Sequence, residues 1–126
     1  MLESKPKQRV LIVDDENMIA DTLALILNAV GYEAAAVYSG ESAMQIAERF
    51  KPDILISDVV MGGINGVDVA ALISKKQPNC KVILLSGQAS TANLVSQDGS
   101  TGRAFEILAK PVHPEVLIDR VRCLAA

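Results

Sequence analysis

Aromatic residues are scarce in this sequence: tryptophan is absent, and two Tyr and two Phe make up 3% of the 126 residues. Platforms on which nucleic-acid bases could stack are therefore nearly missing. The formal charge of −3 also offers no basic surface for a phosphate backbone. We therefore expect no nucleic-acid binding, and we expect a core of Val, Ile, Leu and Ala, as in layered α/β folds.

Cysteine and histidine are also rare. Cys80 and Cys123 are the only cysteines and lack the CxxC or Cys/His spacing of a zinc or redox site, so we predict ordinary free thiols. The single histidine, His113, precedes Pro114 at a predicted helix start, and we assign it no role. No apolar run approaches the ~18 residues that span a bilayer, and the first residues lack a signal-peptide core. We expect a cytoplasmic protein that does not contact membranes.

What the sequence does contain is an alternation of short apolar runs with amphipathic segments, which predicts βαβ units around a parallel sheet. We expect one domain over residues 1–126, with 1–7 as a short N-terminal tail. The predicted strands cover 9–13, 33–37, 53–57, 81–85 and 105–108. The predicted helices cover about 17–30, 40–50 and 66–76, a short stretch within 88–103, and a last segment from 114.

The apolar content of the strands predicts their order in the sheet. The first, third and fourth strands are continuous apolar runs, which is typical of strands covered on both faces, whereas the second and fifth are weaker and belong at the edges. With right-handed crossovers, the favoured arrangement is a doubly wound α/β sheet in the order 2-1-3-4-5.

Chemically capable residues follow four of the five predicted strands: Asp14 and Asp15, Asp58, Ser86 and Lys110. In open α/β sheets ligands bind outside the carboxyl ends of the strands, so these side chains would share one rim. Two carboxylates about 4 Å apart repel by roughly 4 kcal/mol at a dielectric near 20, so three of them require a cation or a proton. Carboxylate oxygens suit Mg²⁺, held by Asp14 or Asp15. Asp58 would then be a nucleophile toward a phosphoryl donor, with Lys110 and Ser86 contacting phosphoryl oxygens.

Other interpretations of these residues fit the sequence less well. An aspartate after a strand is often only a turn former or a helix cap. A small-molecule phosphatase with an aspartyl-phosphate intermediate would commonly carry a second Asp two residues after the nucleophile, where Val60 stands. A flavin-binding electron carrier needs a Ser/Thr/Gly-rich phosphate loop after the first strand, and Asp14, Asp15 and Glu16 would repel a phosphate there.

The residues together resemble the receiver domain of two-component response regulators, over essentially the whole chain. The motif consists of Asp14 and Asp15, Asp58 with Met61, Gly63, Asn65 and Gly66, Ser86 with Gly87, and Lys110 with Pro111. The resemblance implies a flavodoxin-like (βα)5 fold with the same strand order. It also implies a signalling switch that catalyses only its own phosphoryl transfer and dephosphorylation, rather than an enzyme acting on other molecules.

The resemblance also implies individual roles. Asp58 would be the phosphoacceptor, and Asp15 and Asp58 would bind Mg²⁺ together with the Val60 carbonyl, with Asp14 acting largely through water. Ser86 would be the switch hydroxyl and Lys110 the phosphate partner, preceding a cis peptide bond to Pro111. Val60 and Gln88 would tune dephosphorylation.

By the same resemblance, the donor would be a sensor histidine kinase or a phosphotransfer protein. The surface of the fourth helix, fifth strand and fifth helix would pass the signal to a downstream protein. We expect a monomer or a weak dimer.

Three features depart from the family pattern. Gly62 stands where the family commonly has Pro, Ile107 stands where it usually has Tyr or Phe, and the stretch around the predicted fourth helix is rich in Gly and Ser. An aliphatic residue at 107 cannot display the alternative ring positions that report phosphorylation in many relatives. A receiver-like domain that binds partners without being phosphorylated is therefore the alternative function.

Overall fold

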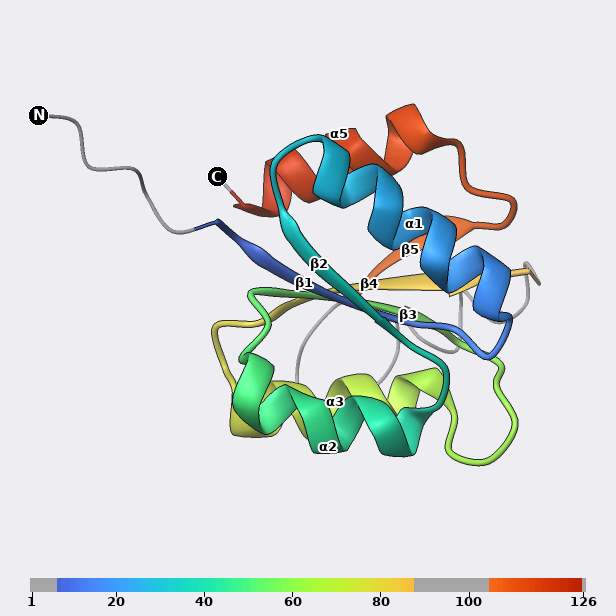
Figure 1. Cartoon of the computed structure of the whole chain (residues 1–126). Coiled ribbons are helices and arrows are strands. Elements are labelled where there is room, and N and C mark those ends of the chain that lie inside the picture. The colour runs from blue at the N-terminus through green and yellow to red at the C-terminus, as the bar shows by residue number, and fades with distance from the viewer. Residues whose placement is uncertain (1–6, 88–104, 126) are drawn as a thin grey trace, which may run out of the picture.

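The computed structural model describes residues 7–87 and 105–125 of the chain (Figure 1). The described strands are Arg9–Val13 (β1), Glu33–Val37 (β2), Ile54–Asp58 (β3), Lys81–Ser86 (β4) and Glu106–Ala109 (β5). The described helices are Asn17–Ala29 (α1), Gly40–Phe50 (α2), Gly66–Lys76 (α3) and Pro114–Ala125 (α5). The fourth helix predicted within 88–103 lies outside the described residues.

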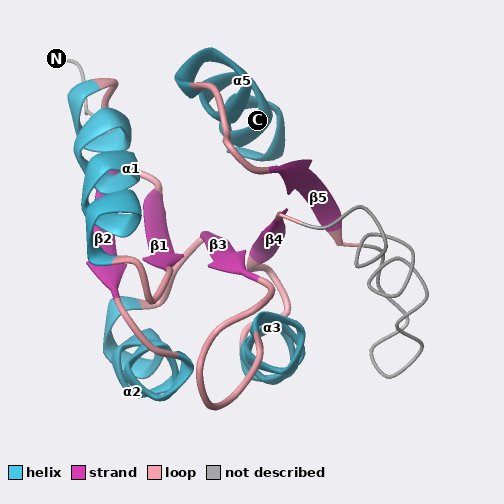
Figure 2. Ribbon diagram, turned by 90° about the vertical axis from the view of Figure 1, so that its right-hand side faces the viewer, coloured by secondary structure: helices cyan, strands magenta, loops and turns pink. Residues whose placement is uncertain are grey.

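All five strands are parallel and lie in the order β2-β1-β3-β4-β5, which confirms the predicted sheet. Helices α1 and α5 cover one face of the sheet, and α2 and α3 cover the other (Figure 2). Since β1 lies between β2 and β3, the chain reverses its direction of winding between β1 and β3. The carboxyl ends of these two strands are therefore the expected ligand-binding edge.

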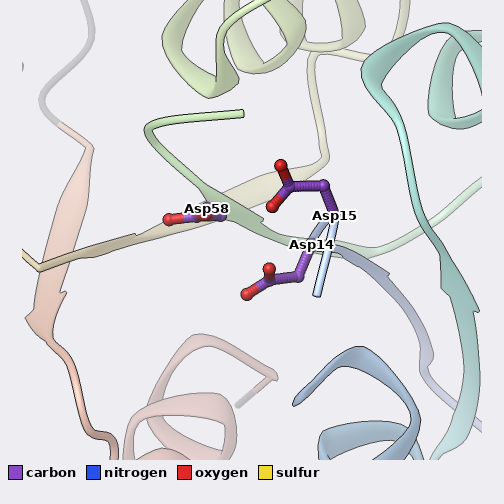
Figure 3. A group of neighbouring side chains, drawn as sticks. All are labelled: Asp14, Asp15 and Asp58. Atoms are coloured by element: carbon purple, nitrogen blue, oxygen red, sulfur yellow. The ribbon is translucent and has the colours of Figure 1, made fainter. Parts of the chain in front are cut away.

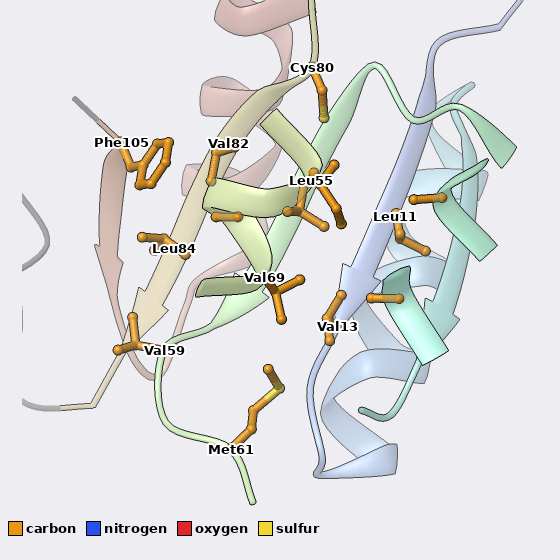
Figure 4. Packing of buried hydrophobic residues seen from close by; sticks show 14 residues of the cluster. Leu11, Val13, Leu55, Val59, Met61, Val69, Cys80, Val82, Leu84 and Phe105 are labelled. Atoms are coloured by element: carbon orange, nitrogen blue, oxygen red, sulfur yellow. The ribbon is translucent and has the colours of Figure 1, made fainter. Parts of the chain in front are cut away.

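Two apolar layers hold the sheet between the helices. Side chains of Leu11, Val13 and Leu55 point toward α2 and α3 (Figure 4), whereas Val10 and Ile12 point toward α1 and α5. This alternation follows from the two-residue period of a strand, and both faces are apolar because both are covered. Burial of each such aliphatic side chain contributes roughly 1.5–3 kcal/mol, so the core supports the strand ends from which the polar residues project.

The strands β3, β4 and β5 each end one residue later than predicted, and this matters for the site. Asp58 is the last residue of β3 and pairs with Leu85, while Ser86 is the last residue of β4 and pairs with Ala109. The sheet also continues past the strand ends, because the N–H of Val59 donates to the carbonyl of Leu85 at 2.9 Å. The backbones of Asp58 and Ser86 are thus fixed by the sheet rather than by a loop.

Two helix ends are capped, and the two cysteines are free thiols as predicted. The Ser39 hydroxyl accepts a hydrogen bond from the N–H of Ser42 at 3.1 Å and caps α2. Gly31 follows α1 with a φ of +105°, a left-handed conformation that suits glycine at a helix end. Cys80 is buried, Cys123 is exposed, and both are free thiols. Among the described helices, none has the length and apolar character needed to cross a membrane.

Candidate functional site

Three aspartates from two neighbouring strands converge at the carboxyl edge of the sheet. Asp14 and Asp15 follow β1 directly, and Asp58 ends the adjacent strand β3. One carboxylate oxygen from each lies within 4.8 Å of the others (Figure 3). The structure therefore brings together the three carboxylates that the strand order places on one rim.

Asp14 is fully buried, and its two carboxylate oxygens have different partners. Oδ1 accepts from the N–H of Glu16 at 2.9 Å. Oδ2 pairs with the ammonium of Lys110, whose Nζ lies 3.0 Å away, and it accepts no further hydrogen bond among the described residues. A buried carboxylate oxygen with a single partner is incompletely satisfied, and a second cation that accepts its free lone pair would lower the free-energy cost of burying it.

Among the residues that the structure describes, Lys110 is the cation paired with the acidic cluster. It follows β5 directly, and its Nζ lies 3.0 Å from Asp14 Oδ2 and 3.3 Å from Asp58 Oδ1. Burial alone would lower the pKa of Lys110, but the attraction of Asp14 and Asp58 outweighs it, so the pKa is raised and the ammonium stays charged. One ammonium cannot balance three carboxylates, which leaves the cluster with a net negative charge.

The carboxyl group of Asp58 is the one most strongly affected by this environment. Asp58 is only 6% exposed, and burial is the largest of the causes that raise the pKa of its carboxyl group. The negative charges of Asp14 and Asp15 raise the pKa further, whereas Lys110 opposes both effects. The ionised form of Asp58 is therefore held at a cost in free energy that an added positive charge would reduce.

Asp15 and Val60 lie at the open side of the cluster. Asp15 is exposed, and its Oδ2 accepts a hydrogen bond from the N–H of Gly62 at 3.4 Å. Val60 lies in the loop after β3, two residues beyond Asp58, and is 61% exposed. Both residues are therefore reachable from solvent, as a site that exchanges ions requires.

Two residues that support Asp58 were not identified from the sequence. A Cβ on Gly66 would lie 1.9 Å from the carbonyl oxygen of Asp58, so the start of α3 touches the strand end only because residue 66 is glycine. The buried hydroxyl of Ser57 donates to the same carbonyl oxygen at 3.1 Å. Gly66 was noted only as part of a motif, and the usable signal for Ser57 was a polar residue inside an otherwise apolar strand.

Ser86 and Lys110 come from β4 and from the end of β5, on the opposite side of β3 from β1. Ser86 is 5% exposed and ends β4, the strand next to β3. The N–H of Lys110 donates to the Ser86 carbonyl at 2.9 Å, so the two residues are fixed relative to each other. The peptide bond from Lys110 to Pro111 is cis, which confirms the prediction.

An apolar groove of about 520 Å³ borders Lys110. Met18 and Ile19 of α1 form one wall, and Pro111 and Val112, which follow Lys110, form the other. Met18 is 81% exposed, so the groove presents an apolar side chain to solvent. His113, the single histidine, is exposed and is not among the residues that line this groove.

The fold and the site define a doubly wound α/β domain with an acidic rim and an opposing lysine. Residues 10–122 match the family described as the response regulator receiver domain, and the chain belongs to this family. This result confirms the resemblance read from the sequence.

Individual relatives agree with the family. The chain is similar to the chemotaxis protein CheY of Thermotoga maritima, with 32% identity over 113 residues, covering 89% of this chain and 92% of that protein. It is 28% identical to the DNA-binding response regulator MtrA of Mycobacterium tuberculosis over 92% of its own length but only 50% of MtrA. The chain thus spans about half the length of the MtrA proteins it matches.

A solved structure agrees as well. The response regulator TrrA of Thermotoga maritima, determined in complex with Mg²⁺ and BeF, is 33% identical and superposes with a TM-score of 0.80. The match covers 93% of this chain and 98% of the TrrA chain.

Proposed function

We propose that this receiver domain is a phosphorylation switch in which Asp58 accepts a phosphoryl group from the phosphohistidine of a sensor histidine kinase or a phosphotransfer protein. The observation that carries the proposal is the position of Lys110, whose Nζ lies within 3.3 Å of the Asp58 carboxylate at the edge of a cluster of three aspartates. A buried carboxylate beside one ammonium and two further carboxylates has the charge arrangement of a phosphoacceptor that works with a divalent cation.

The chemistry is a single displacement at phosphorus. A carboxylate oxygen of Asp58 forms a bond to phosphorus while the bond from phosphorus to the donor imidazole nitrogen breaks, and the electron pair returns to that nitrogen. Lys110 can transfer its contact from the Asp58 carboxylate to a phosphoryl oxygen, because its ammonium already lies 3.3 Å from the attacking group. The hydroxyl of Ser86, at the end of the neighbouring strand, would donate a hydrogen bond to a second phosphoryl oxygen.

The residues present fit a magnesium ion. Asp15 and Asp58 would be its carboxylate ligands with the Val60 carbonyl, and Asp14 would act largely through water. The Oδ2 of Asp14, which is buried and has the Lys110 ammonium as its one partner among the described residues, supports this assignment. When bound, the ion supplies the positive charge that offsets the carboxylates and the incoming phosphoryl group.

The donor has to dock beside Asp58, and the groove at Met18 and Pro111 is the surface that fits this requirement. It borders Lys110, so a donor seated there can present its phosphohistidine to the site. Its walls are apolar, and Met18 adapts to different partner surfaces because its side chain is flexible and polarisable.

The output surface would include β5 and α5, together with the predicted fourth helix outside the described residues. Within the described part, the Arg120 guanidinium of α5 donates through Nε to Glu106 of β5 at 2.9 Å, which ties these two elements together. A change at Ser86 or Lys110 would alter this surface through β4 and β5, and a downstream protein would bind the altered surface.

A second candidate is a receiver-like domain that binds partners without phosphorylation, and the observation that favours it is Ile107. This side chain is partly buried and packs against the core cluster that also contains Leu84 and Phe105. An aliphatic side chain in that position cannot alternate between an inward and an outward aromatic ring.

The remaining expectations belong to the same proposal. We propose a single receiver domain over residues 1–126 that acts in the cytoplasm as a monomer or weak dimer. It would bind proteins rather than nucleic acid, since the net charge is −3. It would catalyse only its own phosphoryl transfer and dephosphorylation, with Val60 and Gln88 tuning the second step.

Intact-mass spectrometry after incubation with acetyl phosphate and Mg²⁺ tests the proposal. We expect one phosphoryl adduct, about 80 Da, on the wild type and on Asp119→Asn, a control at an exposed aspartate of α5. The adduct should be missing from Asp58→Asn and from wild type treated with a chelator. A folded wild type that takes no adduct from acetyl phosphate or from a histidine kinase would favour the phosphorylation-independent domain instead.

A further inference from the structure

The loop between β3 and α3, residues 59–65, is anchored firmly at both ends. The N–H of Val59 donates to Leu85, and the N–H of Gly66 donates to the Val59 carbonyl, each at 2.9 Å. The side chain of Met61 is buried and points into the core beneath α3 (Figure 4). Ile64 packs against α2 so closely that a Cβ on Gly40 would lie 2.2 Å from its Cγ2.

The middle of the loop, Gly62 and Gly63, is exposed and is tied to the acidic site through one contact. The N–H of Gly62 donates to Asp15 Oδ2 at 3.4 Å, and this is the one hydrogen bond of the Gly62 amide among the described residues. Gly63 has a φ of +84°, where other residues are strained, so it cannot be replaced without cost. At Gly62, by contrast, an added Cβ would meet no atom within 4 Å.

The Asp15 carboxylate therefore has one partner in the Gly62 N–H and would have a second in a bound cation. In Figure 3 the Asp15 carboxylate points to the side where Asp14 and Asp58 lie. A cation bound among the three carboxylates would draw it further in that direction. A hydrogen bond from an N–H to a free carboxylate is stronger than one to a carboxylate whose charge a cation has already neutralised. The Gly62 N–H consequently stabilises the ion-free state more than the ion-bound state.

We propose that the Gly62 N–H competes with the divalent cation for Asp15 and thereby lowers the affinity of the site for that cation. This inference rests on the proposed function, because it takes Asp15 as an ion ligand. The residue type at position 62 decides the effect: proline, which the family commonly has here, carries no N–H and cannot make the contact. Gly62 is thus a determinant of metal affinity that acts through its backbone.

Linkage gives the contact a second consequence. If the N–H lowers the affinity for the cation, then the bound cation weakens the tie between the loop and Asp15 by the same factor. The loop middle is released when the ion binds, while Val59 and Gly66 keep its ends in place. Since the hydrogen bond is long and exposed, we expect a change of about two- to tenfold in the dissociation constant.

The test uses Mg²⁺ titrations followed by NMR on the unphosphorylated wild type, Gly62→Pro and Gly62→Ala. Gly62→Pro removes the N–H, and we expect it to bind Mg²⁺ about two- to tenfold more tightly than wild type. Gly62→Ala keeps the N–H and has room for its Cβ, so its affinity should stay within about twofold of wild type. Alanine, like proline, also restricts the backbone conformations that glycine allows. Gly62→Ala therefore controls for the loss of backbone flexibility in Gly62→Pro.

A second measurement on the wild type does not depend on any variant folding. Exchange of the Gly62 amide with water, measured by magnetisation transfer, should become faster when Mg²⁺ is added, because its acceptor is withdrawn. Equal affinities of Gly62→Pro and Gly62→Ala, or a Gly62 amide whose exchange is unchanged or slowed by Mg²⁺, would overturn the competition while leaving the ion site intact. Failure of all three proteins to bind Mg²⁺ would reject both the competition and the proposed ion site.

Discussion

The carboxyl group of Asp58 combines low exposure with two neighbouring negative charges. Burial is the largest cause of its raised pKa, the charges of Asp14 and Asp15 add to it, and Lys110 opposes them. Removing the positive partner or adding a cation would therefore change the state of Asp58 more than that of a surface aspartate. At the scale of single residues, the arrangement that disfavours the charge on Asp58 is also the one that a bound cation would stabilise.

This arrangement predicts that Asp58→Asn stabilises the ion-free protein. The folded pKa of Asp58 lies above its unfolded value, so the fold prefers the protonated form. The resulting cost is absent below the unfolded pKa, near pH 4, grows as the pH rises from the unfolded to the folded pKa, and stays constant above it. At pH 7 the neutral amide removes this cost, and we expect the free energy of unfolding to rise by roughly 1 kcal/mol.

Urea unfolding at pH 7 and at pH 4, with a chelator present, measures this difference. The gain should be clear at pH 7 and much smaller at pH 4, whereas Asp119→Asn, an exposed control, should differ little from wild type at either pH. A loss of stability for Asp58→Asn at pH 7 would show that the contact with Lys110 outweighs burial and the neighbouring charges.

At the scale of elements, the contact between the end of β3 and the start of α3 positions the backbone of Asp58. Asp58 ends β3, Gly66 begins α3, and the side chain of Asn65 caps the helix by accepting from the N–H of Asp68 at 2.9 Å. The absence of a side chain at Gly66 allows the helix end to touch the Asp58 carbonyl, and the Ser57 hydroxyl meets the same oxygen.

Gly66→Ala should therefore damage both stability and phosphorylation. Its Cβ would lie 1.9 Å from a backbone oxygen, which cannot move as a flexible side chain can, so α3 or β3 must shift. We expect a loss of about 1–3 kcal/mol in the free energy of unfolding. The initial rate of labelling by acetyl phosphate should fall as well. Gly62→Ala in the same loop is the control, because its Cβ meets open space, and equal behaviour of the two variants would contradict the proposed role of the contact.

The elements and their order could be predicted from the sequence because their signals are local. Continuous apolar runs identify β1, β3 and β4, and weaker runs identify the edge strands β2 and β5. The ends of β3, β4 and β5 were misplaced by one residue, since the backbone pairing that extends them depends on the neighbouring strand.

In the site, too, some features could be predicted from the sequence and others depend on contacts between distant segments. Asp14, Asp15 and Asp58 could be brought together from strand order alone. The contact of Lys110 with Asp14, the hydroxyl of Ser57 against its own strand end, and the tie from Gly62 to Asp15 depend on side-chain positions and loop paths. No periodic pattern in the sequence specifies those positions.

At the scale of the whole molecule, the proposed phosphoacceptor site and the groove beside it lie on different structural parts. The acceptor belongs to the sheet edge, whereas the groove lies between α1 and the segment that follows β5. On the proposed function, a small donor such as acetyl phosphate would need only the acceptor site, whereas a protein donor would need both. Substitutions in the groove should therefore separate docking from chemistry.

Met18→Lys is the variant that tests this separation. Met18 is 81% exposed, so the change costs little stability, yet it places a charge on an apolar wall of the groove. We expect kcat/KM for transfer from a phosphorylated histidine kinase or phosphotransfer protein to fall about tenfold, which corresponds to roughly 1.4 kcal/mol of lost docking energy. Labelling by acetyl phosphate should remain at the wild-type rate, because the contacts among Asp14, Asp58 and Lys110 are untouched.

Leu25→Lys is the matched control, since Leu25 lies on the same helix, is 72% exposed and does not line the groove. It introduces the same charge into α1, so any long-range electrostatic effect on the donor should appear in both variants. If Leu25→Lys slows protein-dependent transfer as much as Met18→Lys, the donor does not dock in the groove. If Met18→Lys alone slows it while both accept phosphate from acetyl phosphate at equal rates, the groove is the docking surface, because only there does the added charge meet the apolar face of the partner.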